Sequence, residues 1–204
     1  MKIKITPKAI LIPTISLFLI CVIVTAALAL TNHITAGKIA ENELASKNLS
    51  MKNVCPEAQV FDELIPDVLY EGKDEGGKAV GYAISTAAQG YGGQVRVMTG
   101  IVNGEIIGVD VFYNNDETPG LGKNTSNESF RDQFKGLSVN ADIVVSKDNG
   151  TGNAQTVDAV TSATISSRAV AKAVSDAVAI YNENVGSSGT GGADDSQTAG
   201  KEGE

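Results

Sequence analysis

The run from Ala9 to Leu30 contains no charged residue and consists mainly of Ile, Leu, Val, Phe and Ala. A helix of about 22 such residues is long enough to cross a lipid bilayer, so residues 9–30 predict a transmembrane anchor. Residues 1–8 form a basic end with three lysines and no acid, and the positive-inside rule keeps such an end in the cytoplasm. We therefore expect the rest of the chain to lie on the extracytoplasmic side of the cell membrane.

Two other interpretations of this segment stay open. Ala27-Leu28-Ala29 is similar to the small-residue site of a cleavable signal peptide, but the apolar run is longer than an ordinary signal core. Cys21 is a weaker candidate for a lipoprotein cysteine, because Ile20 rather than a small residue precedes it. An uncleaved anchor is the interpretation that the length favours.

Length and charge limit the part of the chain beyond the anchor. A chain of 204 residues leaves room for one modest domain there. The chain carries a formal net charge of −8 and its first 30 residues carry three lysines and no acid, so the remainder carries −11. Such an acidic surface argues against nucleic acid as a partner.

Cysteine and histidine are scarce in this chain. Cys55 is the only cysteine beyond the anchor, which excludes a disulfide within the exported part, and we expect it to be a small, semi-buried residue. His33 is the only histidine, whereas zinc and haem sites normally need several His or Cys ligands. We therefore expect no metal site built by the protein.

The segment after the anchor predicts a helix. Residues 31–55 hold spaced apolar side chains among polar ones with no internal proline, which is typical of a membrane-proximal helix that ends near Val54-Cys55-Pro56. A globular domain then covers residues 56–185. Its first part, Phe61 to Tyr70, is apolar but of undecided type, and the polar run from Glu71 to Gly77 closes it.

Three runs have the composition and alternation of strands. Lys78 to Ala87 places Val80, Tyr82 and Ile84 on one side, and Gln94 to Val102 repeats the pattern. Asn103-Gly104 separates the second run from Glu105 to Tyr113. Because Asn-Gly between two such runs is the strongest short signal for a hairpin, we expect an antiparallel pair here.

The remaining elements complete an α+β fold. Asn127 to Phe134 predicts a helix, Ile143 to Val145 a strand, and Lys147 to Gln155 a polar turn. Ile165 to Val185 has apolar residues at helical spacing, so we expect an amphipathic helix packed on a mostly antiparallel sheet. Residues 186–204 form an acidic, Gly- and Ser-rich tail that lacks the apolar surface to offset its ordering entropy, and we expect it to be disordered.

A cluster of small hydroxyl residues stands where the last helix should begin, in the stretch from Asp158 to Ser167. A helix N-terminus offers unpaired backbone N–H groups and a partial positive charge, which suits a phosphate. Simple capping of the helix by Thr161 or Ser162 explains the same hydroxyls without any ligand.

A second motif, Glu117-Thr118-Pro119-Gly120-Leu121-Gly122, follows directly on a predicted strand. Proline fixes the backbone and glycine removes side-chain bulk, so main-chain groups in such a turn can approach a flat ring. Gly90-Tyr91-Gly92-Gly93 is a weaker feature: Tyr91 can stack near a ring, and a plain hairpin turn explains the sequence equally well.

The hydroxyl cluster resembles the flavinylation signature of the FMN-binding domain found in the G subunit of Rnf-type ion-translocating complexes and in the C subunit of sodium-pumping quinone reductases. That signature is Asp, two residues, Ser or Thr, Gly, Ala, Thr, one residue, then Thr or Ser. It matches here, with serine in the glycine position, at Asp158, Thr161, Ser162, Ala163, Thr164 and Ser166. The segment from Glu117 to Gly122 resembles a loop of the same subunits that lies against the flavin.

The resemblance implies an FMN joined through its phosphate to Thr164 by a separate flavin transferase that uses FAD and Mg²⁺. It also implies a role as an electron-carrier subunit, in a membrane complex that moves electrons between ferredoxin and NAD and transports ions. The flavin then does the redox chemistry, and no catalytic residue is expected, because no serine or cysteine pairs with a plausible base. The alternatives are a stand-alone extracytoplasmic FMN electron-transfer protein and a binding or sensory module without flavin.

Overall fold

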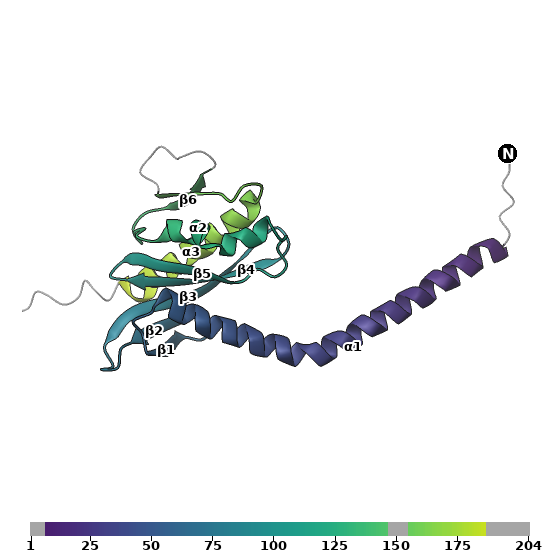
Figure 1. Cartoon of the computed structure of the whole chain (residues 1–204), viewed down its shortest axis with the longest axis horizontal. Helices are drawn as coiled ribbons and strands as arrows, with labels where there is room; N and C mark the ends of the chain where they lie inside the picture. The colour runs from purple at the N-terminus through teal and green to yellow at the C-terminus, as the bar shows by residue number, and fades with distance from the viewer. Residues whose placement is uncertain (1–6, 147–154, 187–204) are drawn as a thin grey trace, which may run out of the picture. The chain divides into compact units, whose positions relative to one another are not determined.

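The computed structural model describes residues 7–146 and 155–186 (Figure 1). The chain divides into two compact units, Met1–Ala45 and Ser46–Glu204. The first unit consists of the greater part of helix α1, and the second unit holds the last turns of α1 and all other elements. Most of the predicted turn at Lys147 to Gln155 and of the predicted tail lies outside the described residues.

Helix α1 runs from Pro7 to Val54 without a break, so the predicted anchor and the predicted membrane-proximal helix are parts of one helix. Ile12, Phe18 and Leu28 are each more than 65% exposed, at 69%, 68% and 67%. Surfaces of this kind are unfavourable in water, and lipid tails solvate them readily. Of the described residues, α1 alone is long and apolar enough to cross a membrane.

A five-stranded antiparallel sheet is the centre of the second unit. Its strands follow the chain in the order β1-β2-β3-β4-β5, and their bounds are Val60–Ile65, Leu69–Lys73, Ala79–Gln89, Gln94–Val102 and Glu105–Tyr113. The hairpin predicted at Asn103-Gly104 is confirmed. Both turn residues have positive φ angles, 51° and 80°, as the two-residue turn that best matches strand twist requires.

The stretch from Phe61 to Tyr70, which the sequence left undecided, contains β1, a tight turn and the start of β2. Asp67 forms the turn with a φ of 62°. The polar run from Glu71 was expected to close this stretch, but β2 continues through it to Lys73. Glu71 and Lys73 are tolerated because they lie beside each other as an ion pair with an N–O distance of 3.2 Å.

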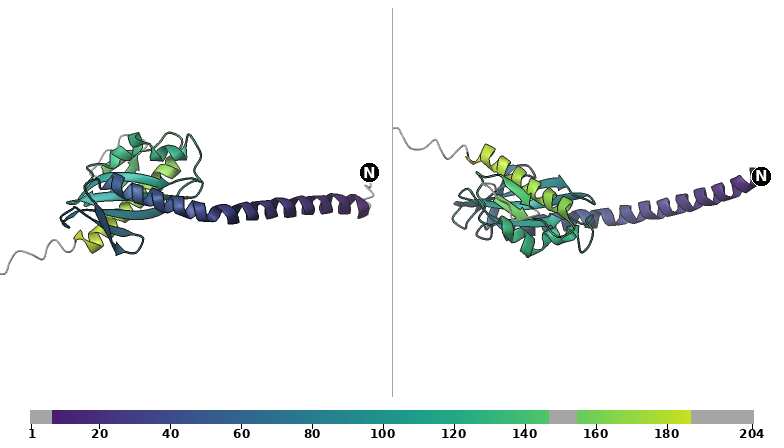
Figure 2. Two further views of the ribbon diagram at one scale, coloured as in Figure 1. Left: turned by 60° about the horizontal axis from the view of Figure 1, so that its bottom comes forward. Right: turned by 90° about the horizontal axis from the view of Figure 1, so that it is seen from above.

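The two faces of the sheet bury two separate cores. Neighbouring residues on a strand point to opposite faces, so Ile84 and Val97 belong to one core and Ala83 and Met98 to the other. Helix α3, Thr164–Asn184, covers the first face, as Figure 2 shows. Met51 and Val54, in the last turn of α1, belong to the core on the second face. A Cβ atom at Gly100 would lie 2.1 Å from the carbonyl oxygen of Val54, so glycine is what lets the end of α1 reach the sheet.

Short elements fill the space between β5 and α3, and they place the site described below. They are η1 (Gly122–Ser126), α2 (Glu128–Arg131), η2 (Asp132–Phe134), β6 (Ile143–Ser146) and β7 (Gln155–Asp158). The helix predicted at Asn127 to Phe134 is thus one α-helical turn followed by a 3-10 turn. Strand β7 was not predicted, and its pairing with β6 is parallel, while the main sheet is antiparallel, as expected. The α+β fold is confirmed.

Candidate functional site

The start of α3 differs from what the hydroxyl cluster suggested. The residue at the N-cap is Ala163, and no side chain caps the helix. The alternative in which Thr161 or Ser162 caps the helix is therefore wrong, because Ala163, whose side chain has no acceptor, occupies the cap position. The first turn of α3 keeps backbone donors without a side-chain acceptor, beside Thr164.

A buried serine that the sequence did not single out holds the segment before α3. The Ser167 hydroxyl accepts a hydrogen bond from the Val160 amide at 3.0 Å and donates one to the Ala163 carbonyl at 3.0 Å. The Ala163 amide also donates to the Val160 carbonyl at 2.9 Å. These bonds fix the tight turn that delivers Thr164 to the helix start. Ser167 lies one residue beyond the matched signature, so no spacing rule pointed to it.

Gln133 of η2 holds the other end of the same segment. Its Oε1 accepts from the Asp158 amide at 2.7 Å and its Nε2 donates to the Asp158 carbonyl at 3.4 Å. Among the described strands, β7 pairs with β6 alone, so the outer side of Asp158 has no partner from these strands, and the side-chain amide of Gln133 supplies both a donor and an acceptor there. No local pattern in the sequence links Gln133 to Asp158.

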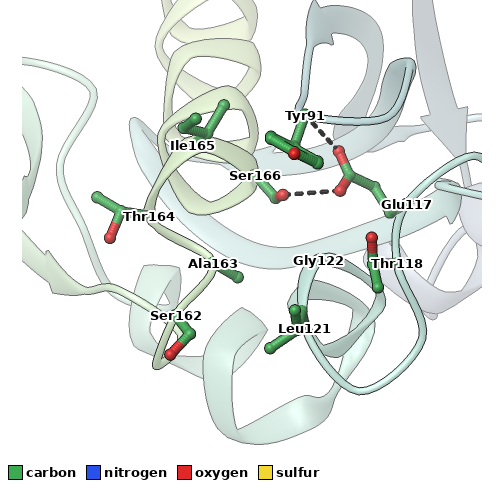
Figure 3. A pocket seen from close by; sticks show the side chains of 10 residues that line it. All are labelled: Tyr91, Glu117, Thr118, Leu121, Gly122, Ser162, Ala163, Thr164, Ile165 and Ser166. Carbon is green, nitrogen blue, oxygen red and sulfur yellow. Dashed lines mark hydrogen bonds between the residues drawn. The ribbon is translucent and has the colours of Figure 1, made fainter.

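The first residue of the second motif is buried at a junction of three segments. Glu117 is only 3% exposed, and its Oε1 accepts from the Tyr91 amide at 2.8 Å and from the Gly92 amide at 3.4 Å. Its Oε2 accepts from the Ser166 hydroxyl at 2.8 Å. Figure 3 shows the carboxylate between the glycine-rich turn and the first turn of α3. Glu117 thereby ties both sequence motifs to the turn at residues 90–93.

A cavity of about 560 Å³ lies where these segments meet (Figure 3). Its lining residues come from the glycine-rich turn, from the loop after β5 and from the start of α3: Tyr91, Glu117, Thr118, Leu121, Gly122, Ser162, Ala163, Thr164, Ile165 and Ser166. Eight of these were predicted as cofactor-binding residues, and Tyr91 was named as a weaker candidate. Ile165 was missed, because its spacing in the sequence indicates only a helix core position.

The other predicted site residues lie elsewhere. Gly120, Asp158 and Thr161 line a neighbouring hollow of about 500 Å³ that shares Leu121 and Ser162 with the first cavity. Pro119 lines neither of these two cavities, and it shapes the loop by its backbone. The structure thus places the two sequence motifs around adjoining hollows.

The first cavity combines apolar and polar walls. Tyr91, Leu121 and Ile165 are 72%, 40% and 55% exposed, which is unusual for large apolar side chains on one small area. Thr164, which also lines the cavity, is half-buried and is the first residue of α3. A ligand with a flat aromatic ring and a phosphate matches both parts of this surface.

Two protein families match parts of this chain. The FMN-binding domain family matches residues 90–179, which include all the lining residues, and the RnfG N-terminal region family matches residues 1–54. These two matches define the class of the protein, an FMN-binding domain that follows an N-terminal helix.

Curated relatives narrow the class further. The G subunit of the Na(+)-translocating ferredoxin:NAD(+) oxidoreductase complex of Acetobacterium woodii is 34% identical over an alignment of 201 positions, and the match covers 88% of this chain and 95% of that protein. The G subunit of the proton-translocating ferredoxin:NAD(+) oxidoreductase complex of Clostridium ljungdahlii is 32% identical over 166 residues, which cover 81% and 88%. The chain belongs to this G subunit family.

A solved structure that is similar to this chain is the C subunit of the Na(+)-translocating NADH-quinone reductase of Parabacteroides distasonis. It is 21% identical to this chain with a TM-score of 0.48, and the match covers 55% of this chain and 59% of that one.

Proposed function

We propose that this protein carries one FMN as a phosphoester of Thr164 and passes electrons within a membrane-bound, ion-translocating ferredoxin:NAD oxidoreductase complex. The observation that carries the proposal is the single cavity that brings Thr164 together with the loop from Glu117 to Gly122. The segments that hold the two motifs are about 40 residues apart in the chain. Formation of a hydrophobic core does not require them to meet at an exposed apolar surface, and such a surface is typical of a binding site. The membership of the chain in the G subunit family supports the same role.

The residues present fit a covalent flavin phosphate. The uncapped first turn of α3 offers backbone N–H groups to phosphate oxygens. Tyr91, Leu121 and Ile165 offer apolar surface to a ring, and the glycine-rich loops admit its polar edge. When bound, FMN supplies the electron transfer, while the protein fixes its position and its electrostatic surroundings.

Attachment requires a partner enzyme of the flavin transferase class with FAD as the donor. The Thr164 hydroxyl oxygen forms a bond to the FMN phosphorus, the pyrophosphate bond of FAD breaks, AMP leaves and the hydroxyl proton passes to the transferase. Among the described residues that line the cavity, Glu117 is the one carboxylate, and its oxygens already accept three hydrogen bonds, so we assign the proton transfer to the transferase. The hydrogen bonds of Ser167 and Gln133 to Val160 and Asp158 hold the backbone of the segment that leads to Thr164.

We place this site outside the cytoplasm, because Lys2, Lys4 and Lys8 precede the apolar helix and the acids follow it. A covalent bond is advantageous there, since a dissociated flavin would not be replaced from the cytoplasmic pool. The relatives from Acetobacterium woodii and Clostridium ljungdahlii are named for different coupling ions, so we assign this protein to the family without assigning it an ion.

The test is co-expression with a flavin transferase, followed by a denaturing gel viewed under ultraviolet light. Wild-type protein should give a fluorescent band, and Thr164→Ala should give none, while its fold persists because no side chain caps α3. Thr156→Ala is the matched control, since Thr156 is an exposed hydroxyl residue nearby that lines neither cavity. A fluorescent band from Thr164→Ala would show that another residue carries the flavin and would overturn the assignment.

A further inference from the structure

Hydrogen bonds from two other segments hold the carboxylate of Glu117 in place. Its three hydrogen-bond partners among the described residues all donate to it: the amides of Tyr91 and Gly92 and the hydroxyl of Ser166. An ionised carboxylate accepts through both oxygens, so this arrangement satisfies the charged form of the side chain.

Glycines on two sides make room for this carboxylate. A Cβ atom at Gly90 would lie 2.0 Å from Oε1, and one at Gly122 would lie 2.0 Å from Oε2. Real Cβ atoms do not approach so closely, so any other residue at either position would displace the carboxylate. The backbone at both glycines therefore leaves space for the Glu117 carboxylate, which indicates that the surroundings are specific for this side chain.

Within the part of the chain that the structure describes, the Glu117 carboxylate forms no ion pair. Hydrogen bonds stabilise the carboxylate without cancelling its negative charge. At 3% exposure little solvent screens that charge, so its field reaches the cavity that it lines.

We propose that Glu117 is a fixed negative charge that lowers the reduction potential of the flavin in this cavity. The inference rests on the proposed function, because it requires the ring to lie beside Thr164 and Glu117. Reduction of a flavin adds electrons and makes its ring more negative unless protons follow. A carboxylate at short range in a poorly solvated site disfavours that change, and the potential falls. Glu117 is thus a tuning residue as well as a structural one.

Glu117→Gln tests the charge while keeping the shape. The glutamine Oε1 can accept from Tyr91, and its Nε2 can donate to Ser166, whose hydroxyl both donates and accepts. Both proteins are loaded with flavin by co-expression, and the midpoint potential is measured by spectroscopic titration. We expect the variant to be easier to reduce by about tenfold in the equilibrium constant, or about 30 mV for a two-electron couple.

Asp116→Asn is the matched control, because it removes the same charge from the neighbouring residue, which is exposed. Solvent and salt screen that position, so the midpoint potential of Asp116→Asn should stay close to that of wild type, and any small difference should shrink as the ionic strength rises. Ser166→Ala keeps the carboxylate and deletes one donor to it, so its potential should not rise. Equal rises in Glu117→Gln and Ser166→Ala would indicate a loosened site and would overturn the inference.

A measurement without flavin checks the charge itself. In the unloaded protein, the amide protons of Tyr91 and Gly92 should move upfield in NMR spectra of Glu117→Gln, because a neutral acceptor binds them more weakly. Unchanged amide shifts would show that Glu117 is not an anion there. A wild-type protein that takes up no flavin contradicts the proposed function, whereas loaded proteins of equal potential contradict only the role of Glu117.

Discussion

Ser162 has a backbone conformation that is strained for any residue other than glycine. Its φ angle is 61°, in the left-handed region, and the family signature usually has glycine at this position. That conformation costs a residue with a Cβ atom roughly 1–2 kcal/mol. The turn at Ser162 is nevertheless required, because it buries Ala163 and brings Thr164 to the cavity.

Replacing Ser162 by glycine should therefore stabilise the protein. We expect Ser162→Gly to raise the free energy of unfolding by about 0.5–1 kcal/mol, since glycine adopts the left-handed conformation at little steric cost. Calorimetry of the flavin-free protein measures the change. Thr161→Gly is the control of opposite sign, because Thr161 is not among the residues with positive φ. A Ser162→Gly variant less stable than wild type would show that the serine side chain stabilises the turn.

At the scale of single residues, the sequence predicted most of the residues that line the cavity, but it did not predict the residues that fix the lining segments by hydrogen bonds. Thr164 and Glu117 stand in motifs whose spacing is recognisable, and the structure puts both on one cavity. Gln133 and Ser167 act through hydrogen bonds to backbone groups of other segments. Such bonds depend on tertiary approach, which has no signature in the local order of side chains.

The end of α1 is joined to the β1–β2 turn by a charged contact. Lys47 Nζ lies 2.8 Å from Asp67 Oδ1 and 5.1 Å from the centre of the Tyr70 ring. Burial pulls the Lys47 pKa down, but the hydrogen bonds to Asp67 and Tyr70 outweigh it, and the pKa is raised. The same hydrogen bond from Lys47 lowers the pKa of Asp67.

This contact predicts a pH dependence of stability. A carboxylate whose pKa is lower in the folded state stabilises the fold above its unfolded pKa, and loses that effect as the pH falls through the folded value. Asp67→Asn should therefore melt below wild type at pH 7, and the difference should narrow below about pH 3.9, the ordinary aspartate pKa. Asparagine also tolerates the positive φ of residue 67.

Thermal melts of wild type and Asp67→Asn between pH 2 and 7 measure this difference. Asp142→Asn is the control, because Asp142 is exposed and takes part in none of the ion pairs of the described residues. A gap between wild type and Asp67→Asn that is constant with pH would show that the ion pair is not its source.

Among the elements, those with a strong local pattern were predicted and those set by distant pairing were not. The two residues Asn103 and Gly104 specify the turn of their hairpin, and the apolar residues of α3 have clear helical spacing. Strand β1 has a burial pattern that is mostly exposed, so it lacks the alternation that identifies a strand. Strand β7 has four residues and forms because β6 lies alongside, which no local pattern specifies.

The whole molecule combines an apolar helix with a separate unit that carries the cavity. We propose that Lys2, Lys4 and Lys8 orient the chain, so that Ser46–Glu204 lies outside the cytoplasm. Protease added to intact spheroplasts should then degrade a tag at the C-terminus and spare a tag at the N-terminus.

Charge reversal provides the control for this orientation. Replacing the three lysines by glutamate should reduce the fraction of chains whose C-terminal tag is accessible, because the orienting charges are lost. Conversion of Lys38, Lys47 and Lys52 to glutamine, beyond the apolar run, should leave the fraction unchanged. A C-terminal tag protected in wild-type spheroplasts would contradict the proposed placement of the flavin.

The measurement that tests the central claim most directly is the intact mass of the full-length protein co-expressed with a flavin transferase. We expect a gain equal to one FMN less one water, and peptide mapping that assigns this gain to Thr164. An unchanged mass in cells where a known transferase substrate is fully modified would contradict the covalent attachment.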